Sequence, residues 1–72
     1  MSLDDSAGVV INGEERRVAS GTRLAELLAE IGLDPARVAV ERNLAIVPRS
    51  TFAEVMVEDG DAYEIVQFVG GG

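Results

Sequence analysis

The C-terminal segment is the part of this chain whose residue types could do chemistry. The apolar run 65–69 passes directly into Gly70, Gly71 and Gly72. Glycine has no Cβ atom, so such a tail is slim enough to thread a narrow channel in another protein and carry a terminal carboxylate to a distant active site. A carboxylate can attack the α-phosphate of ATP, and the resulting acyl adenylate acylates a sulfur or amine nucleophile. A frayed end or a vector remnant is the alternative interpretation.

The missing residue types exclude most other chemistry. The 72 residues include no His and no Cys, which removes zinc-finger sites, thiolate nucleophiles and imidazole bases. All 6 basic residues are arginines, so there is no lysine for a Schiff base or for an isopeptide link between copies of the chain. A formal net charge of −7 argues against nucleic acid binding. These absences favour a chain that is not itself an enzyme.

The 13 acidic residues form no recognisable metal or acid–base site. Glu58, Asp59 and Asp61 flank Gly60, but their spacing is not that of a calcium-binding EF-hand loop. We therefore interpret 58–61 as a solvated turn between two strands.

Two local patterns predict the first half of the fold. The Asn12-Gly13 pair between β-rich runs predicts a hairpin over 9–19, because both residues tolerate positive φ. Apolar residues at i, i+3, i+4 and i+7 then predict an amphipathic helix of about ten residues, with Thr22 as its N-cap and Gly32 ending it. Its apolar positions are Leu24, Leu27, Leu28 and Ile31.

The second half is predicted to contain strands joined by turns. A strand is expected over 38–42, continuing in extended form to residue 47. A helical turn over 50–53 would place Phe52 in the core. A short strand is expected over 54–57.

The last strand, predicted over 62–69, contains the candidate partner-binding residues. Period-two alternation places Tyr63 and Ile65 toward the helix and Val66 and Phe68 toward the opposite face. An exposed apolar patch beside a reactive tail is a candidate docking site, so we predict that Val66 and Phe68 bind a partner. Coverage of these two side chains by the chain's own loops is the alternative.

These elements together predict an α+β fold of the β-grasp type, a mixed sheet of about four to five strands with one main helix packed across it. The first and last strands are the expected central pair. We expect a flexible N-terminal lead over 1–7, one domain over 8–69 and a flexible glycine tail over 70–72. The chain has no apolar run approaching the roughly 18 residues of a membrane span and no signal peptide, so a cytoplasmic location without membrane contact is expected.

Four segments carry a family resemblance, namely VERN at 40–43, IVPR at 46–49, DGD at 59–61 and EIVQFVGGG at 64–72. They resemble the ThiS family of bacterial thiamine-pathway sulfur carriers, within the ubiquitin-like β-grasp superfamily that also contains the MoaD carriers. The resemblance covers residues 8–72. It departs from the family pattern at Asn43-Leu44-Ala45, where family members often carry Asn-Gly or Asn-x-Glu, and this difference could alter a turn.

The resemblance implies a sulfur carrier whose Gly72 carboxylate is adenylated by an E1-like (ThiF-type) enzyme using ATP and magnesium. The adenylate would be converted to a thiocarboxylate with sulfur that a cysteine desulfurase draws from cysteine. The thiocarboxylate would donate sulfur to thiazole synthase (ThiG-type), which builds the thiazole moiety of thiamine. Gly70 and Gly71 would be the slim tail that threads the partner's channel. The resemblance implies no cofactor or metal bound by this chain.

Three other functions remain open. The small subunit of molybdopterin synthase, or another thiocarboxylate carrier, would use the same chemistry, although molybdopterin synthase small subunits are usually longer and tend to have proline before the final glycines. A ubiquitin-like protein modifier would instead join target lysines through Gly72. A β-grasp interaction module would make no chemical use of its glycine tail.

Overall fold

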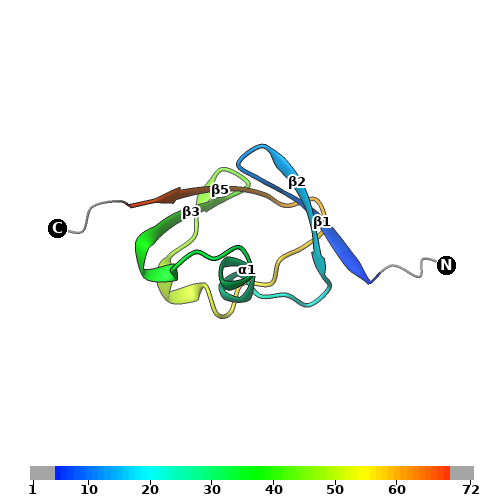
Figure 1. Cartoon of the computed structure of the whole chain (residues 1–72), viewed down its shortest axis with the longest axis horizontal. Helices are drawn as coiled ribbons and strands as arrows, with labels where there is room; N and C mark the ends of the chain where they lie inside the picture. The colour runs from blue at the N-terminus through cyan, green and yellow to red at the C-terminus, as the bar shows by residue number, and fades with distance from the viewer. Residues whose placement is uncertain (1–4, 69–72) are drawn as a thin grey trace.

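The structure is a computed structural model that describes residues 5–68, and residues 1–4 and 69–72 lie outside it. Within this range, five strands form one sheet and a single α-helix packs across it (Figure 1). In chain order the elements are β1 (Ser6–Ile11), β2 (Glu14–Ala19), α1 (Leu24–Glu30), the 3₁₀ turn η1 (Pro35–Arg37), β3 (Val38–Arg42), β4 (Ala45–Ile46), the 3₁₀ turn η2 (Arg49–Thr51) and β5 (Ala62–Gln67).

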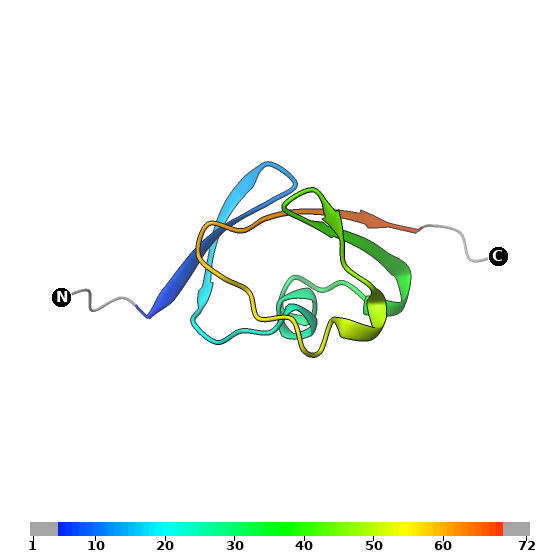
Figure 2. The ribbon, with the colours of Figure 1, turned by 180° about the vertical axis from the view of Figure 1, so that it is seen from behind.

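The last strand, β5, lies at the centre of the sheet. The spatial order is β2-β1-β5-β3-β4, with β5 parallel to β1 and antiparallel to β3. Helix α1 lies beneath the sheet in Figure 1 and also in the reversed view of Figure 2. The predicted α+β class, the mixed sheet with one helix and the pairing of the first and last strands are therefore confirmed.

The predicted hairpin is present, and its turn also holds β5. Asn12 and Gly13 have φ values of 50° and 85° and form a two-residue connection between β1 and β2. The Asn12 side chain then bonds Ile65 twice, because its Oδ1 accepts from the Ile65 N–H at 2.7 Å and its Nδ2 donates to the Ile65 carbonyl at 3.1 Å. The turn therefore fixes β5 against β1 as well as reversing the chain.

The first strand begins earlier than predicted. β1 starts at Ser6, two residues before the expected domain start at residue 8, and it pairs with β2 from its first residue. Ala7 is buried, and the Ser20 N–H donates to the Asp5 carbonyl at 2.7 Å. The predicted lead over 1–7 was therefore too long, because the small apolar side chain of Ala7 belongs to the core.

Helix α1 is shorter than the predicted ten residues and begins after a different cap. The N-cap is Arg23, whose backbone N–H donates to the Glu26 carboxylate at 2.8 Å. Thr22 was the predicted N-cap, and this prediction was wrong, because its hydroxyl donates to the carbonyl three residues earlier. Gly32 follows the helix with a φ of 80°, as predicted.

The hydrophobic core lies between α1 and the sheet. Leu24, Leu27 and Leu28 have no exposed surface, which confirms the helical periodicity. Alternate residues of the strands face them, as the period-two pattern requires. The remaining core members are Ala7, Val9, Val18, Val38, Val40, Phe52, Val57, Tyr63 and Ile65.

Two predicted extended segments differ in the structure. Residues 43–47 do not continue β3, because Asn43 and Leu44 form a two-residue turn with φ values of 50° and 72°, and β4 then returns antiparallel to β3. The predicted strand over 54–57 is also absent, since Met56 makes only one isolated bridge, to Arg23. The helical turn before Phe52 is confirmed, one residue earlier than predicted.

Leu44 is strained without being buried, and this yields a prediction. Its side chain is 91% exposed, so no packing offsets the left-handed backbone conformation. We expect Leu44→Gly to raise the free energy of unfolding by about 0.5–1 kcal/mol, because relief of the Cβ strain exceeds the entropy that glycine loses on folding. Urea denaturation measures the change. Leu44→Ala keeps the strain and is the matched control, so a glycine variant no more stable than the alanine variant would contradict the prediction.

Candidate functional site

The end of β5 positions the candidate site. β5 pairs with a strand on each side. Directly after β5, the Phe68 N–H donates to the Arg37 carbonyl at 2.8 Å. The end of β5 and the start of β1 lie at opposite ends of the molecule (Figure 1). Phe68 is therefore held at the edge of the domain by the residue that precedes β3.

The two predicted partner-binding residues are exposed. Val66 is 59% exposed and Phe68 is 52% exposed, whereas Tyr63 and Ile65 are buried. The predicted alternation along β5 is therefore confirmed, and the alternative that the chain's own loops cover Val66 and Phe68 is wrong. Partner binding by Val66 and Phe68 stays a prediction.

The other predicted site residues are the tail glycines Gly70 and Gly71 and the terminal Gly72. They lie outside the described residues. Their predicted roles in threading and in carboxylate chemistry stay predictions.

Two further apolar residues adjoin Val66 and Phe68 on the outer face of the sheet. Ala39 is the cross-strand partner of Val66, and Ile46, which is 77% exposed, lies on β4 beyond β3. We call Ala39, Ile46, Val66 and Phe68 the outer patch. Sequence reasoning missed Ile46 because it treated 43–47 as a continuation of β3. An Asn-initiated two-residue turn was the signal that could have revealed it.

The turn over 58–61 is only partly solvated, which corrects the prediction. Asp61 is just 5% exposed. Its Oδ2 accepts from Arg42 Nε at 3.0 Å, from the Tyr63 hydroxyl at 2.9 Å and from the Glu58 N–H at 2.9 Å, while its Oδ1 accepts from Asn43 Nδ2 at 3.2 Å. Asp61 is buried because side chains two positions apart in an extended segment point to the same face. Asp61 stands two residues before Tyr63 and therefore points to the same, core-facing side.

This network shifts the pKa values of its members. Burial by itself would raise the pKa of Asp61, but hydrogen bonds from the Glu58 backbone, Tyr63, Asn43 and Arg42 outweigh it and hold the pKa below its usual value. Burial raises the pKa of Tyr63, and the Asp61 carboxylate raises it further. Asp61 is therefore ionised and Tyr63 protonated at neutral pH.

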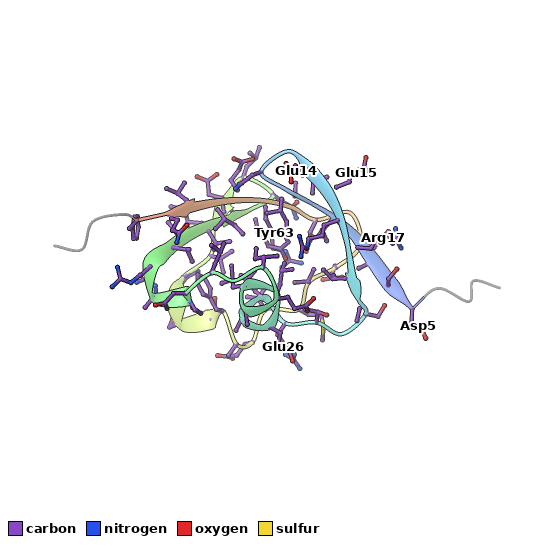
Figure 3. The ribbon with its side chains drawn as sticks, in the orientation of Figure 1. Asp5, Glu14, Glu15, Arg17, Glu26 and Tyr63 are labelled. Carbon is purple, nitrogen blue, oxygen red and sulfur yellow. The ribbon has the colours of Figure 1, made fainter. Side chains whose placement is uncertain are left out.

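The network lies in the interior of the domain. Tyr63 lies between β5 and α1 in Figure 3, out of contact with solvent. Between residues 5 and 68, no buried side-chain N or O atom lacks a hydrogen-bond partner. The network therefore joins the β3–β4 turn, the 58–61 turn and the start of β5 into one unit.

The described residues include an exposed apolar surface but no cluster of the kind that holds a metal ion. No set of three or more acidic side chains in the described range could hold a metal ion. No helix within 5–68 is long and apolar enough to cross a membrane. What this part of the chain provides is an exposed apolar surface beside the end of its central strand.

The architecture defines a class of protein, the ubiquitin-like β-grasp domains, in which one helix packs across a mixed sheet. The crystal structure of the thiamine biosynthesis protein ThiS from Geobacter metallireducens has this fold, with a TM-score of 0.75 and 34% sequence identity. The match covers 90% of this chain and 99% of that one. Residues 9–72 match the model of the ThiS family. The chain therefore belongs to the ThiS family.

Two curated relatives differ greatly in length. The sulfur carrier protein ThiS of Bacillus subtilis is 40% identical over 63 residues, which are 86% of this chain and 96% of the relative. A thiazole synthase of Paramagnetospirillum magneticum is 56% identical over 64 residues, which are 89% of this chain but 20% of the relative. The chain thus spans about a fifth of that thiazole synthase and nearly the whole of the Bacillus carrier.

The lowered pKa of Asp61 predicts how stability depends on pH. A carboxylate with a lowered pKa stabilises the folded state above its unfolded pKa of about 3.9, and this contribution is lost as the pH falls through the folded value. We expect Asp61→Asn to lower the free energy of unfolding by about 2–4 kcal/mol at pH 7, because Arg42 loses its buried partner.

Urea denaturation at pH 7 and again well below pH 4 measures this effect. The difference between wild type and Asp61→Asn should shrink at the acidic pH, where the wild-type carboxyl is itself becoming neutral. Glu54→Gln, at an exposed residue, is the control and should change stability little at either pH. If Asp61→Asn lowered the free energy of unfolding by the same amount at both pH values, the result would show that Asp61 does not act through its charge.

Proposed function

We propose that this chain is a sulfur carrier that supplies sulfur for the thiazole moiety of thiamine. The observation that carries the proposal is the family match, which runs from β1 through the final glycine at residue 72. The near-complete coverage of the Bacillus carrier supports a role as a small carrier rather than as an enzyme. The match to the ThiS family favours this function over the small subunit of molybdopterin synthase.

The first chemical step uses the carboxylate of Gly72. One of its oxygens attacks the α-phosphate of ATP, pyrophosphate leaves, and an acyl adenylate forms. An E1-like, ThiF-type enzyme binds the ATP and magnesium, so this chain needs no cofactor of its own. Gly70 and Gly71 carry the carboxylate into that enzyme because their lack of side chains lets them pass a narrow channel.

The second step replaces an oxygen by sulfur. A persulfide, whose sulfur a cysteine desulfurase has taken from cysteine, attacks the acyl carbon and displaces AMP. A thiol then cleaves the acyl disulfide, which releases the thiocarboxylate and leaves a disulfide on the donor side. The thiocarboxylate is the form that delivers sulfur to a ThiG-type thiazole synthase.

Two observations support these partners. The Paramagnetospirillum thiazole synthase is a longer protein that contains a segment resembling this chain, which supports a close working relationship between carrier and synthase. Val66 on β5 and Phe68, which follows β5 directly, are exposed apolar residues that precede the glycines 70–72 in the sequence. A partner that receives the tail would bury them, so we assign both to the docking contact.

Intact-mass measurement tests the chemistry. After incubation with ATP, magnesium, the adenylating enzyme, a cysteine desulfurase and cysteine, the chain should gain the mass difference between one sulfur and one oxygen, located at Gly72. Deletion of Gly72 should abolish the gain with little effect on stability. An unchanged wild-type mass, with an adenylating enzyme active on its own carrier, would contradict the proposal, and covalent attachment to other proteins would indicate a protein modifier.

Phe68→Ala tests the docking contact. We expect binding to the adenylating enzyme or the synthase to weaken about tenfold or more, because truncation of a large aromatic anchor removes much of the contact energy. The melting temperature should change little, since the side chain is half exposed. Met56→Ala, at a partly exposed apolar residue bridged to Arg23, is the matched control for binding. A large fall in melting temperature with unchanged affinity would instead assign Phe68 to the core.

A further inference from the structure

Two glutamates face each other on the outer surface of the sheet. Glu41 on β3 is the direct cross-strand partner of Glu64 on β5, which places their Cβ atoms about 4.5–5.5 Å apart on one face. Both are exposed, and neither has an ion pair with any residue between 5 and 68. Like charges directly opposite each other destabilise an antiparallel pair. The described residues therefore place these two like charges opposite each other and give neither of them an ion-pair partner.

The outer patch borders this acidic pair. Ile46 is the cross-strand partner of Glu41, and Val66 follows Glu64 by two residues, about 6.5–7 Å further along the same face. Glu41, Glu64, Ile46, Val66 and Ala39 line one shallow groove. The surface therefore changes from anionic to apolar along β5, in the direction of Phe68.

We propose that Glu41 and Glu64 together receive one arginine side chain of the partner protein, while an apolar neighbour of that arginine packs on the outer patch. A planar guanidinium has five N–H donors and can bridge two carboxylates. Its aliphatic stem packs on apolar surface such as Ile46 and Val66. The identity of the partners, an adenylating enzyme and a thiazole synthase, rests on the proposed function.

Charge complementarity selects this occupant over others. A second copy docked by two-fold symmetry on this face would add a second pair of glutamates to the same interface, and the chain already has a net charge of −7. Nucleic acid and anionic membrane surfaces are repelled for the same reason. A cationic protein surface is the occupant that relieves the repulsion between Glu41 and Glu64.

The binding experiment compares Glu41→Gln, Glu64→Gln and the double variant with wild type, using the purified adenylating enzyme and thiazole synthase from the same genome. Titration at several salt concentrations gives the dissociation constants. We expect the double variant to bind at least one of the two enzymes about tenfold or more weakly at low salt. The difference should shrink as salt rises, because charge attraction is screened. Glu54→Gln makes the same charge change at an exposed residue off the sheet and should bind as wild type.

The stability experiment needs no partner. Either single glutamine variant should raise the melting temperature by about 1–5 °C, because it removes the like-charge pair. Glu54→Gln should leave the melting temperature unchanged. A residue that strengthens binding although it destabilises the free domain is one retained for recognition. A structural role for Glu41 or Glu64 would instead predict that the glutamine variants lower the melting temperature.

The outcomes separate this inference from the proposed function. A double variant that binds both enzymes within twofold of wild type at every salt concentration would overturn the inference, and normal thiocarboxylate formation in the same samples would leave the proposed function standing. A melting temperature lowered by the single variants would also overturn it. A wild-type chain that binds neither enzyme and gains no sulfur would overturn both.

Discussion

β5 lies between β1 and β3 at the centre of the sheet, and the other features of the molecule depend on that placement. Its neighbours bond it on both sides, and Asn12 adds two side-chain bonds at Ile65. A strand held in this way can present one face to α1 and the other to a partner without shifting. The residues after Phe68 therefore follow a strand that is hydrogen-bonded on both sides.

The start of β5 is anchored by a buried charge rather than by apolar packing. Asp61 accepts hydrogen bonds from Arg42 and Asn43 at the β3–β4 turn and from Glu58 and Tyr63 near itself in the sequence. One carboxylate therefore joins residues 42–43 to residues 58–63. Breaking a buried pair of this kind exposes the cost of an unpaired ion, which is why such a network confers order as much as energy.

The two faces of the sheet differ in burial, because one packs against α1 and the other is exposed. Toward α1, packing is close and every leucine of the helix face is buried, which gives a small domain the core that it needs. Away from α1, the outer patch and the opposed glutamates stay exposed. Under the proposed function the carrier binds two enzymes in turn, and such a surface suits contacts that form and dissociate repeatedly.

Local residue patterns were enough to predict the hairpin at Asn12-Gly13, the helix periodicity and the alternation along β5, because each depends on neighbours in sequence. The turn at Asn43-Leu44 was missed because leucine is unfavourable at positive φ, and only pairing of β4 with β3 compensates it. Burial of Asp61 was missed because two of its four donors, Arg42 and Asn43, lie about 20 positions away in the sequence. Cross-strand register alone decided that Glu41 meets Glu64, since opposition across a sheet depends on pairing and not on spacing in the sequence.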